Sequence, residues 1–303
     1  MKLFKTFFSL AVLAGATALA SAAEDFNVLV FSKTNGFRHK DAIEVGVPFF
    51  KKQGELHNFK VDATEDVSAF TEDNLKKYSA IVLLCTTGDF LTNKPAKNAS
   101  PEEKQKEKAD SLLRREAFRK YVENGGGIVG LHAATDGFWQ GSAAWPEFQK
   151  IIGGAFQHHP QHQTSTINIV DKAHPTVKHL VAKGDTWIAF DEWYNFQLLQ
   201  KDNHVILTVD DSTCKGAKVS LYAPVIKEDG EKFVEKATIH PFAWTRSYGK
   251  GKVFYTSRGH FGSAFGEPDY AQHVIAGLFW TLGKPAPEVN PESLPKVKPP
   301  KKK

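Results

Sequence analysis

Cysteine is scarce in this chain, since Cys85 and Cys214 are the only two among 303 residues. A framework of disulfides therefore does not hold the fold together, although one bridge between the two cysteines is possible. Cys85 ends the apolar run Ala80–Cys85, a position that favours a buried and unreactive thiol. The fold must be stabilised by a hydrophobic core, and a chain with 41% hydrophobic residues has enough of them to form one.

Long hydrophobic stretches are also missing, because none reaches the roughly 18 to 20 residues of a transmembrane helix. Phe7–Ala20 comes nearest, and it lies between two basic residues, Lys2 and Lys5, and the small-residue pattern Ala20-Ser21-Ala22. Such a sequence is typical of a signal peptide with its cleavage site. We therefore expect residues 1–22 to be a signal peptide and the mature protein to be exported, periplasmic or secreted, without a transmembrane segment.

The folded body lacks a strong surplus of either charge. The formal net charge is +5, but Lys2 and Lys5 belong to the predicted signal peptide, and residues 284–303 carry six lysines against two glutamates. The rest of the chain is close to neutral, which argues against a nucleic-acid-binding protein. The prolines and lysines of residues 284–303 predict a disordered basic tail.

Several familiar enzyme motifs are absent as well. The chain has no Gly-x-Ser-x-Gly nucleophile elbow, no phosphate-binding Gly-x-x-x-x-Gly-Lys loop and no His-Glu-x-x-His zinc motif. Gly125-Gly126-Gly127 precedes an apolar run instead of following one, so it does not match the dinucleotide-binding fingerprint. A nicotinamide-dependent enzyme is therefore not favoured.

Strands alternate with helices in the first half of the chain. The predicted strands are Asn27–Phe31, Phe59–Thr64, Ala80–Cys85 and Ile128–Leu131. The helices predicted between them are His39–Gln53, Thr71–Lys77 and Leu112–Asn124. We expect Pro48 to kink or break the first helix and residues 91–110 to form an exposed insertion. The alternation predicts βαβ units and a parallel sheet.

The second half is richer in strands. The clearest are Thr166–Val170, His204–Val209 and Lys252–Thr256, and a helix predicted at Ala271–Leu282 closes the domain. Together the two halves predict a single α/β domain over residues 23–283.

Three histidines follow predicted strands: His39, His132 and His260. In an open parallel sheet, ligands bind beyond the carboxyl ends of the strands, so these side chains are expected to converge on one edge. Histidine suits such a place because its charge changes near neutral pH and it also binds metals. The alternative is that they are ordinary surface or core residues without a role in chemistry.

Two further groups of residues point to the same edge. Gly153-Gly154 leads to the pair His158-His159, of which at most one is expected to face the site on an extended segment. Asp191-Glu192-Trp193-Tyr194 combines two carboxylates with two aromatic rings, as a sugar-binding cleft does. A buried carboxylate there would serve as acid or base, while the alternative is a solvated charge pair beside core aromatics.

Five motifs, in this order along the chain, resemble the ThuA-like (trehalose utilisation) family. They are Gly125–Asp136, Gly153–Phe156 with His159-Pro160, Asp191–Phe196, His240–Trp244, and Gly249–Thr256 with Gly259-His260. The resemblance implies a fold similar to class I glutamine amidotransferases, a flavodoxin-like α/β fold whose mostly parallel sheet has helices on both faces. Those enzymes carry a nucleophilic cysteine in the turn after the strand matching Ile128–Leu131. Here His132 occupies that turn, so glutaminase activity is not expected.

The resemblance also implies a role in carbohydrate metabolism, with trehalose, a related disaccharide or a keto-sugar as the ligand. Our first hypothesis is a sugar-active enzyme with acid–base chemistry by His132, Glu192 and His260. The candidate substrate-binding residues are His39, Thr135, Asp136, His159, Asp191, Trp193 and Arg246.

Two alternatives remain open from the sequence. The first is a divalent metal site built from His39, His132, His159, Glu192 or His260, since zinc accepts such nitrogen and oxygen ligands. The second is a non-catalytic carbohydrate-binding protein, because a fold does not fix a function. In that case tryptophans would stack on the sugar, and the candidates are Trp139, Trp145, Trp187, Trp193 and Trp244.

Overall fold

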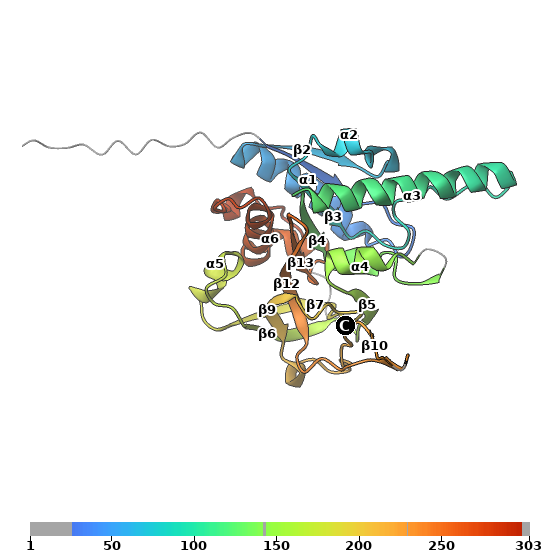
Figure 1. Ribbon diagram of the computed structural model, residues 1–303. Helices are drawn as coiled ribbons and strands as arrows, with labels where there is room; N and C mark the ends of the chain where they lie inside the picture. The colour runs from blue at the N-terminus through green and yellow to red at the C-terminus, as the bar shows by residue number, and fades with distance from the viewer. Residues whose placement is uncertain (1–25, 142–143, 229, 299–303) are drawn as a thin grey trace, which may run out of the picture.

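The computed structural model describes residues 26–141, 144–228 and 230–298 (Figure 1). The predicted signal peptide, residues 1–22, lies outside them. Within these ranges, no helix combines the length and the apolar character that crossing a lipid bilayer requires.

The central element is a nine-stranded sheet with the strand order β2-β1-β3-β4-β13-β12-β9-β6-β7 (Figure 1). The first five strands are parallel, and they are β2 (Phe59–Thr64), β1 (Phe26–Phe31), β3 (Ala80–Leu84), β4 (Gly127–Leu131) and β13 (Gly251–Thr256). Their order is the flavodoxin-like one, so the predicted fold class is confirmed.

Four antiparallel strands extend this sheet, a feature that the sequence did not predict. They are β12 (Pro241–Tyr248), β9 (His204–Val209), β6 (Gln163–Ile169) and β7 (Thr186–Asp191). Two short ribbons accompany them, β5 (Ala155–His158) with β8 (Asn195–Gln197) and β10 (Val225–Ile226) with β11 (Lys232–Phe233).

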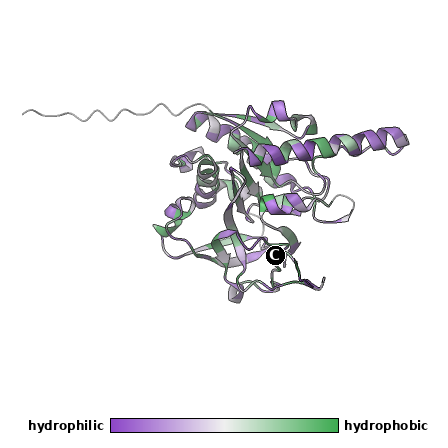
Figure 2. Ribbon diagram, viewed as in Figure 1, coloured by the Kyte–Doolittle hydropathy of each residue, from purple (hydrophilic) through white to green (hydrophobic). Residues whose placement is uncertain are grey.

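Helices cover both faces of the parallel half. One face carries α1 (Lys40–His57) and α6 (Pro268–Thr281), and the other carries α3 (Pro101–Glu123) and α4 (Pro146–Ile152). Along β1, Val28 and Val30 pack with the first pair of helices while Leu29 and Phe31 pack with the second. Coverage of both faces explains why the inner strands β1, β3 and β4 are almost wholly apolar, as the green ribbons of the parallel half in Figure 2 indicate. The remaining helices are α2 (Glu72–Leu75) and α5 (Lys178–Val181).

Helix α3 begins well before the predicted Leu112, and it takes up half of the expected insertion at 91–110. Ser100 accepts a hydrogen bond from the Glu103 backbone, and the Glu103 carboxylate accepts one from the Ser100 backbone. This capping box, followed by Pro101 in the first turn, starts the helix. The amino-terminal half of α3 extends beyond the rest of the domain and is hydrophilic (Figures 1 and 2). Without an apolar face, it gave no helical pattern in the sequence.

Helix α1 runs through Pro48 without a break, so of the two predicted effects of Pro48 the break does not occur. Pro48 and Glu44 are exposed, so water can satisfy the Glu44 carbonyl that loses its helical donor, while Phe49 and Phe50 are buried and anchor the helix.

The predicted disordered tail is wrong for residues 284–298, the part of it that the structure describes. Val289 and Leu294 are buried in the core on the α1–α6 face. The side chain of Gln272 on α6 donates to the Pro287 carbonyl and accepts from the Val289 backbone. A few apolar residues among the prolines are therefore enough to dock this segment.

Candidate functional site

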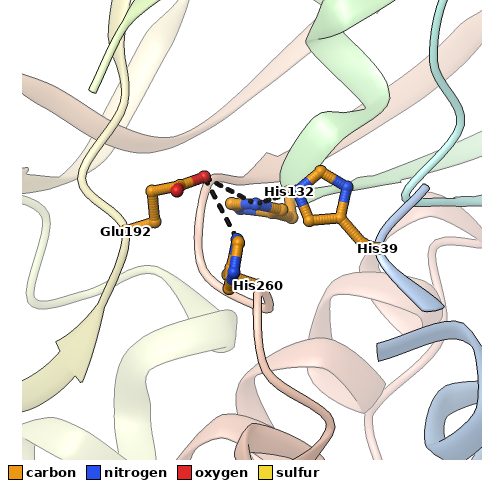
Figure 3. Close-up of side chains that lie close together, drawn as sticks. All are labelled: His39, His132, Glu192 and His260. Carbon is orange, nitrogen blue, oxygen red and sulfur yellow. Dashed lines mark hydrogen bonds and ion pairs between the residues drawn. The ribbon is translucent and has the colours of Figure 1, made fainter. Parts of the chain in front are cut away.

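Four strands that run in the same direction, β1, β4, β13 and β7, end at one edge of the sheet. The chemically important residues that follow them are His39, His132, His260 and Glu192. The predicted convergence of the three histidines on one edge is therefore confirmed, and Figure 3 shows His132 and His260 beside the carboxylate of Glu192, with His39 on the far side of His132.

Glu192 reaches the histidines because the sheet is strongly curved. β7 is four places from β13 in the strand order, which corresponds to about 19 Å in a flat sheet. The backbone N–H groups of Gly259 and His260 nevertheless donate to Asp191, the last residue of β7, over 3.1 and 3.2 Å. The antiparallel half therefore turns back toward the ends of the parallel strands and brings Glu192 with it.

The centre of the site is a chain of close contacts between four side chains. His132 Nε2 lies 3.1 Å from His39 Nε2 and 3.4 Å from Glu192 Oε2. His260 Nδ1 lies 3.1 Å from the same oxygen, Glu192 Oε2. The four nitrogen and oxygen atoms all lie within 4.8 Å of one another, and only His260 among these residues is not fully buried.

Two more histidines contact the other oxygen of this carboxylate. His162 Nε2 lies 2.9 Å and His159 Nδ1 lies 3.1 Å from Glu192 Oε1. Their side chains are 40% and 38% exposed, whereas that of Glu192 is 4% exposed. We call Glu192 and the five histidines at positions 39, 132, 159, 162 and 260 the Glu192 cluster.

Burial and charge set the protonation of this cluster. Burial alone would raise the pKa of Glu192, but its contacts with His132 and His260 outweigh this effect and hold the pKa well below its ordinary value. Burial lowers the pKa of His39 to about 2, and the neighbouring His132 adds to this effect. Burial would also lower the pKa of His260, but its hydrogen bond to Glu192 and the charge of Glu192 raise it. The cluster therefore combines an ionised carboxylate, a neutral His39 and a proton that favours His260.

A sharp turn after β4 places His132. Its φ of 48° lies in the left-handed region, which a residue with a side chain adopts at a cost of about 1 kcal/mol or more. His132 Nδ1 lies 2.7 Å from the Ser257 carbonyl and must donate to it. Its Nε2 is then an acceptor that faces the cluster, and the Tyr194 hydroxyl lies 3.1 Å from it.

Asp191 positions the cluster but does not face it. Its carboxylate accepts hydrogen bonds from the backbone of Glu192, Gly259 and His260. It also lies 3.4 Å from Nε of Arg258, and the side chains of this pair are 0% and 1% exposed. Asp191 was predicted to bind substrate, but it is occupied in holding the loop that carries His260.

Four other predicted substrate-binding residues are not brought into the cluster. Thr135 is buried and hydrogen-bonds to the Tyr255 hydroxyl, and Asp136 accepts from the Trp139 indole. Trp193 is fully buried and donates to the Gln163 carbonyl. Arg246 lies opposite Val253, away from the carboxyl end of β13, and binds Asp202.

Tryptophan stacking on a sugar is not supported for three of the five candidates, because Trp187, Trp193 and Trp244 belong to the core. They were chosen for their ring type alone, and a large aromatic ring is more often part of a core than of a binding surface.

Sequence analysis missed His162 and Tyr194. The antiparallel pairing of β6 with β7 places Gln163 opposite Asp191, so His162 comes next to Glu192. That register, which the sequence pattern alone did not reveal, was the signal needed to find His162. Tyr194 was part of the motif Asp191-Glu192-Trp193-Tyr194, but the sequence did not predict its contact with His132.

Neither cysteine offers a nucleophile. Cys85 and Cys214 are free and buried, and burial raises the pKa of both thiols. The turn after β4, which carries the cysteine in the amidotransferases, holds His132 here.

A groove of about 480 Å³ lies at the opposite edge of the sheet, near Ser79, Gly125 and Gly126, where β3 and β4 begin. Its lining has no histidine and only one carboxylate, Glu72, so it lacks paired groups for proton transfer or metal binding.

Comparison with known proteins relates this fold and motif set to one family. The model of the ThuA family, described as trehalose utilisation, matches residues 27–281. A ThuA-like protein from Bacteroides uniformis is 24% identical, covers 90% of this chain and 98% of its own, and superposes with a TM-score of 0.62. One from Parabacteroides merdae is 21% identical, with coverage of 88% and 93% and a TM-score of 0.57. No curated protein matches the sequence significantly.

Proposed function

Because this chain belongs to the ThuA (trehalose utilisation) family, we propose that it is an exported enzyme that acts on a disaccharide or a keto-sugar at the Glu192 cluster. Family membership supports the carbohydrate-related function. The identity of the sugar, the export and the chemistry are our proposal.

The observation that carries the proposal is the convergence of four histidines on one buried carboxylate. His132 and His260 contact one oxygen of Glu192, and His159 and His162 contact the other. A buried carboxylate without partners would be strongly destabilising, so this arrangement keeps Glu192 ionised at a place where a neutral residue would suit the fold better. A buried, ionised carboxylate surrounded by histidines is unusual in a protein core and is typical of a functional site.

The arrangement is suited to moving protons to and from sugar oxygens. A proton favours His260, whose side chain is partly exposed and can approach a ligand, while Glu192 balances its charge. His132 donates from Nδ1 to the Ser257 carbonyl, which leaves Nε2 as the atom that faces the cluster. A hydroxyl, a glycosidic oxygen or the carbonyl oxygen of a keto-sugar are the groups that such donors and acceptors would serve, with an expected rate contribution of about 10²–10⁴-fold.

Thermal unfolding of the mature protein with trehalose, other disaccharides and their keto derivatives tests the proposal. A ligand that binds only the folded protein at about 100 times its dissociation constant adds about 2.7 kcal/mol to the free energy of unfolding. We expect one sugar class to raise the midpoint and be turned over, and His260→Gln to lose both effects.

His204→Gln is the matched control. His204 is exposed, pairs with Asp171 and begins β9 at the opposite edge of the sheet, so its loss should change neither effect. Saturable sugar binding without turnover would instead indicate a carbohydrate-binding protein. If no sugar shifts the midpoint, the proposed ligand class is wrong.

A further inference from the structure

We propose that His39, His132, Glu192 and His260 form a binding site for one divalent transition-metal cation, with zinc as the expected ion. The site joins four segments of the chain and draws on a carboxylate and three imidazoles that point toward one another (Figure 3).

The spacing of the four atoms fits coordination of a single ion. Two ligand atoms that each lie about 2.1 Å from a metal are about 3.0 Å apart at a right angle and about 3.4 Å apart at the tetrahedral angle. The three successive contacts His39–His132, His132–Glu192 and Glu192–His260 measure 3.1, 3.4 and 3.1 Å. The largest separation among the four atoms stays within 4.8 Å, close to the about 4.2 Å between ligands on opposite sides of an ion. In a tetrahedral site every pair of ligand atoms lies about 3.4 Å apart, so the widest pair would have to close by up to about 1.4 Å when an ion binds.

His39 and His132 face each other through their Nε2 atoms, an arrangement that also favours a bound cation. His39 Nε2 and His132 Nε2 are 3.1 Å apart, and both rings are buried. His132 donates its Nδ1 proton to the Ser257 carbonyl, so its Nε2 carries a lone pair that faces His39. In the metal-free protein His39 Nε2–H can donate to this lone pair, and a bound cation would displace that proton to His39 Nδ1, which is buried without a hydrogen-bond partner. A cation between the two nitrogens would bind both lone pairs.

The surroundings of the ligands have the form that metal sites require. A ligand histidine usually donates its second ring nitrogen to a carbonyl or carboxylate, as His132 does to Ser257. A ligand carboxylate is itself hydrogen-bonded, as Glu192 Oε1 is by His162 over 2.9 Å. Asp191 holds the backbone of both Glu192 and His260.

The donor set selects the class of ion. Three imidazole nitrogens and one carboxylate oxygen suit zinc and neighbouring first-row divalent ions, whereas Mg²⁺ and Ca²⁺ prefer oxygen ligands. One carboxylate leaves the site with a single positive charge when a divalent ion binds three neutral imidazoles.

A bound ion would change which residues of the Glu192 cluster transfer protons. It would replace the proton that His260 and Glu192 share, and as a Lewis acid it would polarise a sugar oxygen or a water. Proton transfer would then fall to His159 and His162, which lie on the other oxygen of Glu192 and are the more exposed. This assignment rests on the proposed function, whereas binding of the ion does not.

Metal analysis of the mature chain tests the site directly. The protein is stripped with a chelator, loaded with Zn²⁺, dialysed, and measured for metal content and for Zn²⁺ affinity by calorimetry. We expect one zinc per chain, and no comparable retention of Mg²⁺ or Ca²⁺. His39→Gln and His260→Gln should each weaken Zn²⁺ binding by more than about 100-fold, since both remove a ligand.

Two further variants separate ligands from supporting residues. His162→Gln should weaken binding by about 10–100-fold, the usual effect of losing a residue that only orients a ligand. His204→Gln should have no effect. Circular dichroism confirms that each variant is folded, and visible absorption of the Co²⁺-loaded protein gives a second readout that should change in His260→Gln.

Substoichiometric zinc in the wild-type protein, or equal Zn²⁺ affinity in wild type, His39→Gln and His260→Gln, would overturn the metal site. The result is independent of the sugar experiments. Zinc binding without any effect of sugars would refute the proposed function alone, and sugar turnover by a protein that retains no zinc after loading would refute the metal site alone.

Discussion

Replacement of Asp191 by asparagine should destabilise the protein strongly although no group of Asp191 faces the Glu192 cluster. The carboxylate accepts three backbone N–H groups, from Glu192, Gly259 and His260. An asparagine amide has the same shape but presents an NH₂ group in place of one oxygen, so at least one buried N–H would meet a donor. Each unsatisfied buried group costs about 1–3 kcal/mol.

The substitution also removes a negative charge from beside Arg258, which is 1% exposed. Breaking a buried ion pair by removing one partner costs about 3–5 kcal/mol. Arg258 keeps a second partner, since its Nη2 lies 2.6 Å from Glu267. The lower end of the range therefore applies, and we expect Asp191→Asn to lower the free energy of unfolding by about 3 kcal/mol.

Urea denaturation of wild type and variant measures this change, with Asp185→Asn as the matched control. Asp185 forms a 2.8 Å ion pair with Lys172, but its side chain is 74% exposed, so its loss should cost less than about 1 kcal/mol. A loss below 1 kcal/mol for Asp191→Asn would refute the reasoning. If the metal site exists, Asp191→Asn should also weaken Zn²⁺ binding by about 10–100-fold, and Asp185→Asn should not.

Three other changes have defined outcomes. Leu294→Ala should lower the free energy of unfolding by about 2–3 kcal/mol, because Leu294 is buried in the core, and unchanged urea denaturation would show that the segment is not docked. Ser100→Ala should cost about 1 kcal/mol of stability in α3 and speed amide hydrogen exchange in its first turns, whereas unaltered exchange would contradict the role of the capping box. Burial lowers the pKa of His273 to about 3 from 6.5, so only the unfolded chain takes up this proton as the pH falls from 6.5 toward 3, and stability should fall with it. His273→Leu should flatten this slope by up to about 1.4 kcal/mol per pH unit in urea titrations at several pH values, and an unchanged slope would exclude His273 as its source.

The parallel half of the fold was predictable because a strand that is buried on both faces is a recognisable apolar run in the sequence. The inner strands β1, β3 and β4 are almost wholly apolar, and a histidine placed after such a run must lie at the carboxyl edge. His39, His132 and His260 were found in this way.

The rest depended on long-range pairing. His162 joins the site through the register of β6 against β7, and Glu192 joins it through the curvature of the sheet. Neither is encoded in a local pattern. Arg246 was misplaced for the same reason, since β12 runs in the direction opposite to β13 and carries this residue away from the carboxyl edge.

The contact between His39 and His260, whose ring centres are 4.9 Å apart, joins the first and last parts of the domain. Closing so long a stretch of chain costs conformational entropy before any contact is gained, and topologies dominated by such contacts fold slowly. The cluster is therefore complete only when β13 lies between β4 and β12. An incomplete chain emerging from a ribosome would carry the ligands of the proposed metal site separately, and the compartment in which the whole domain folds would determine which ion that site acquires.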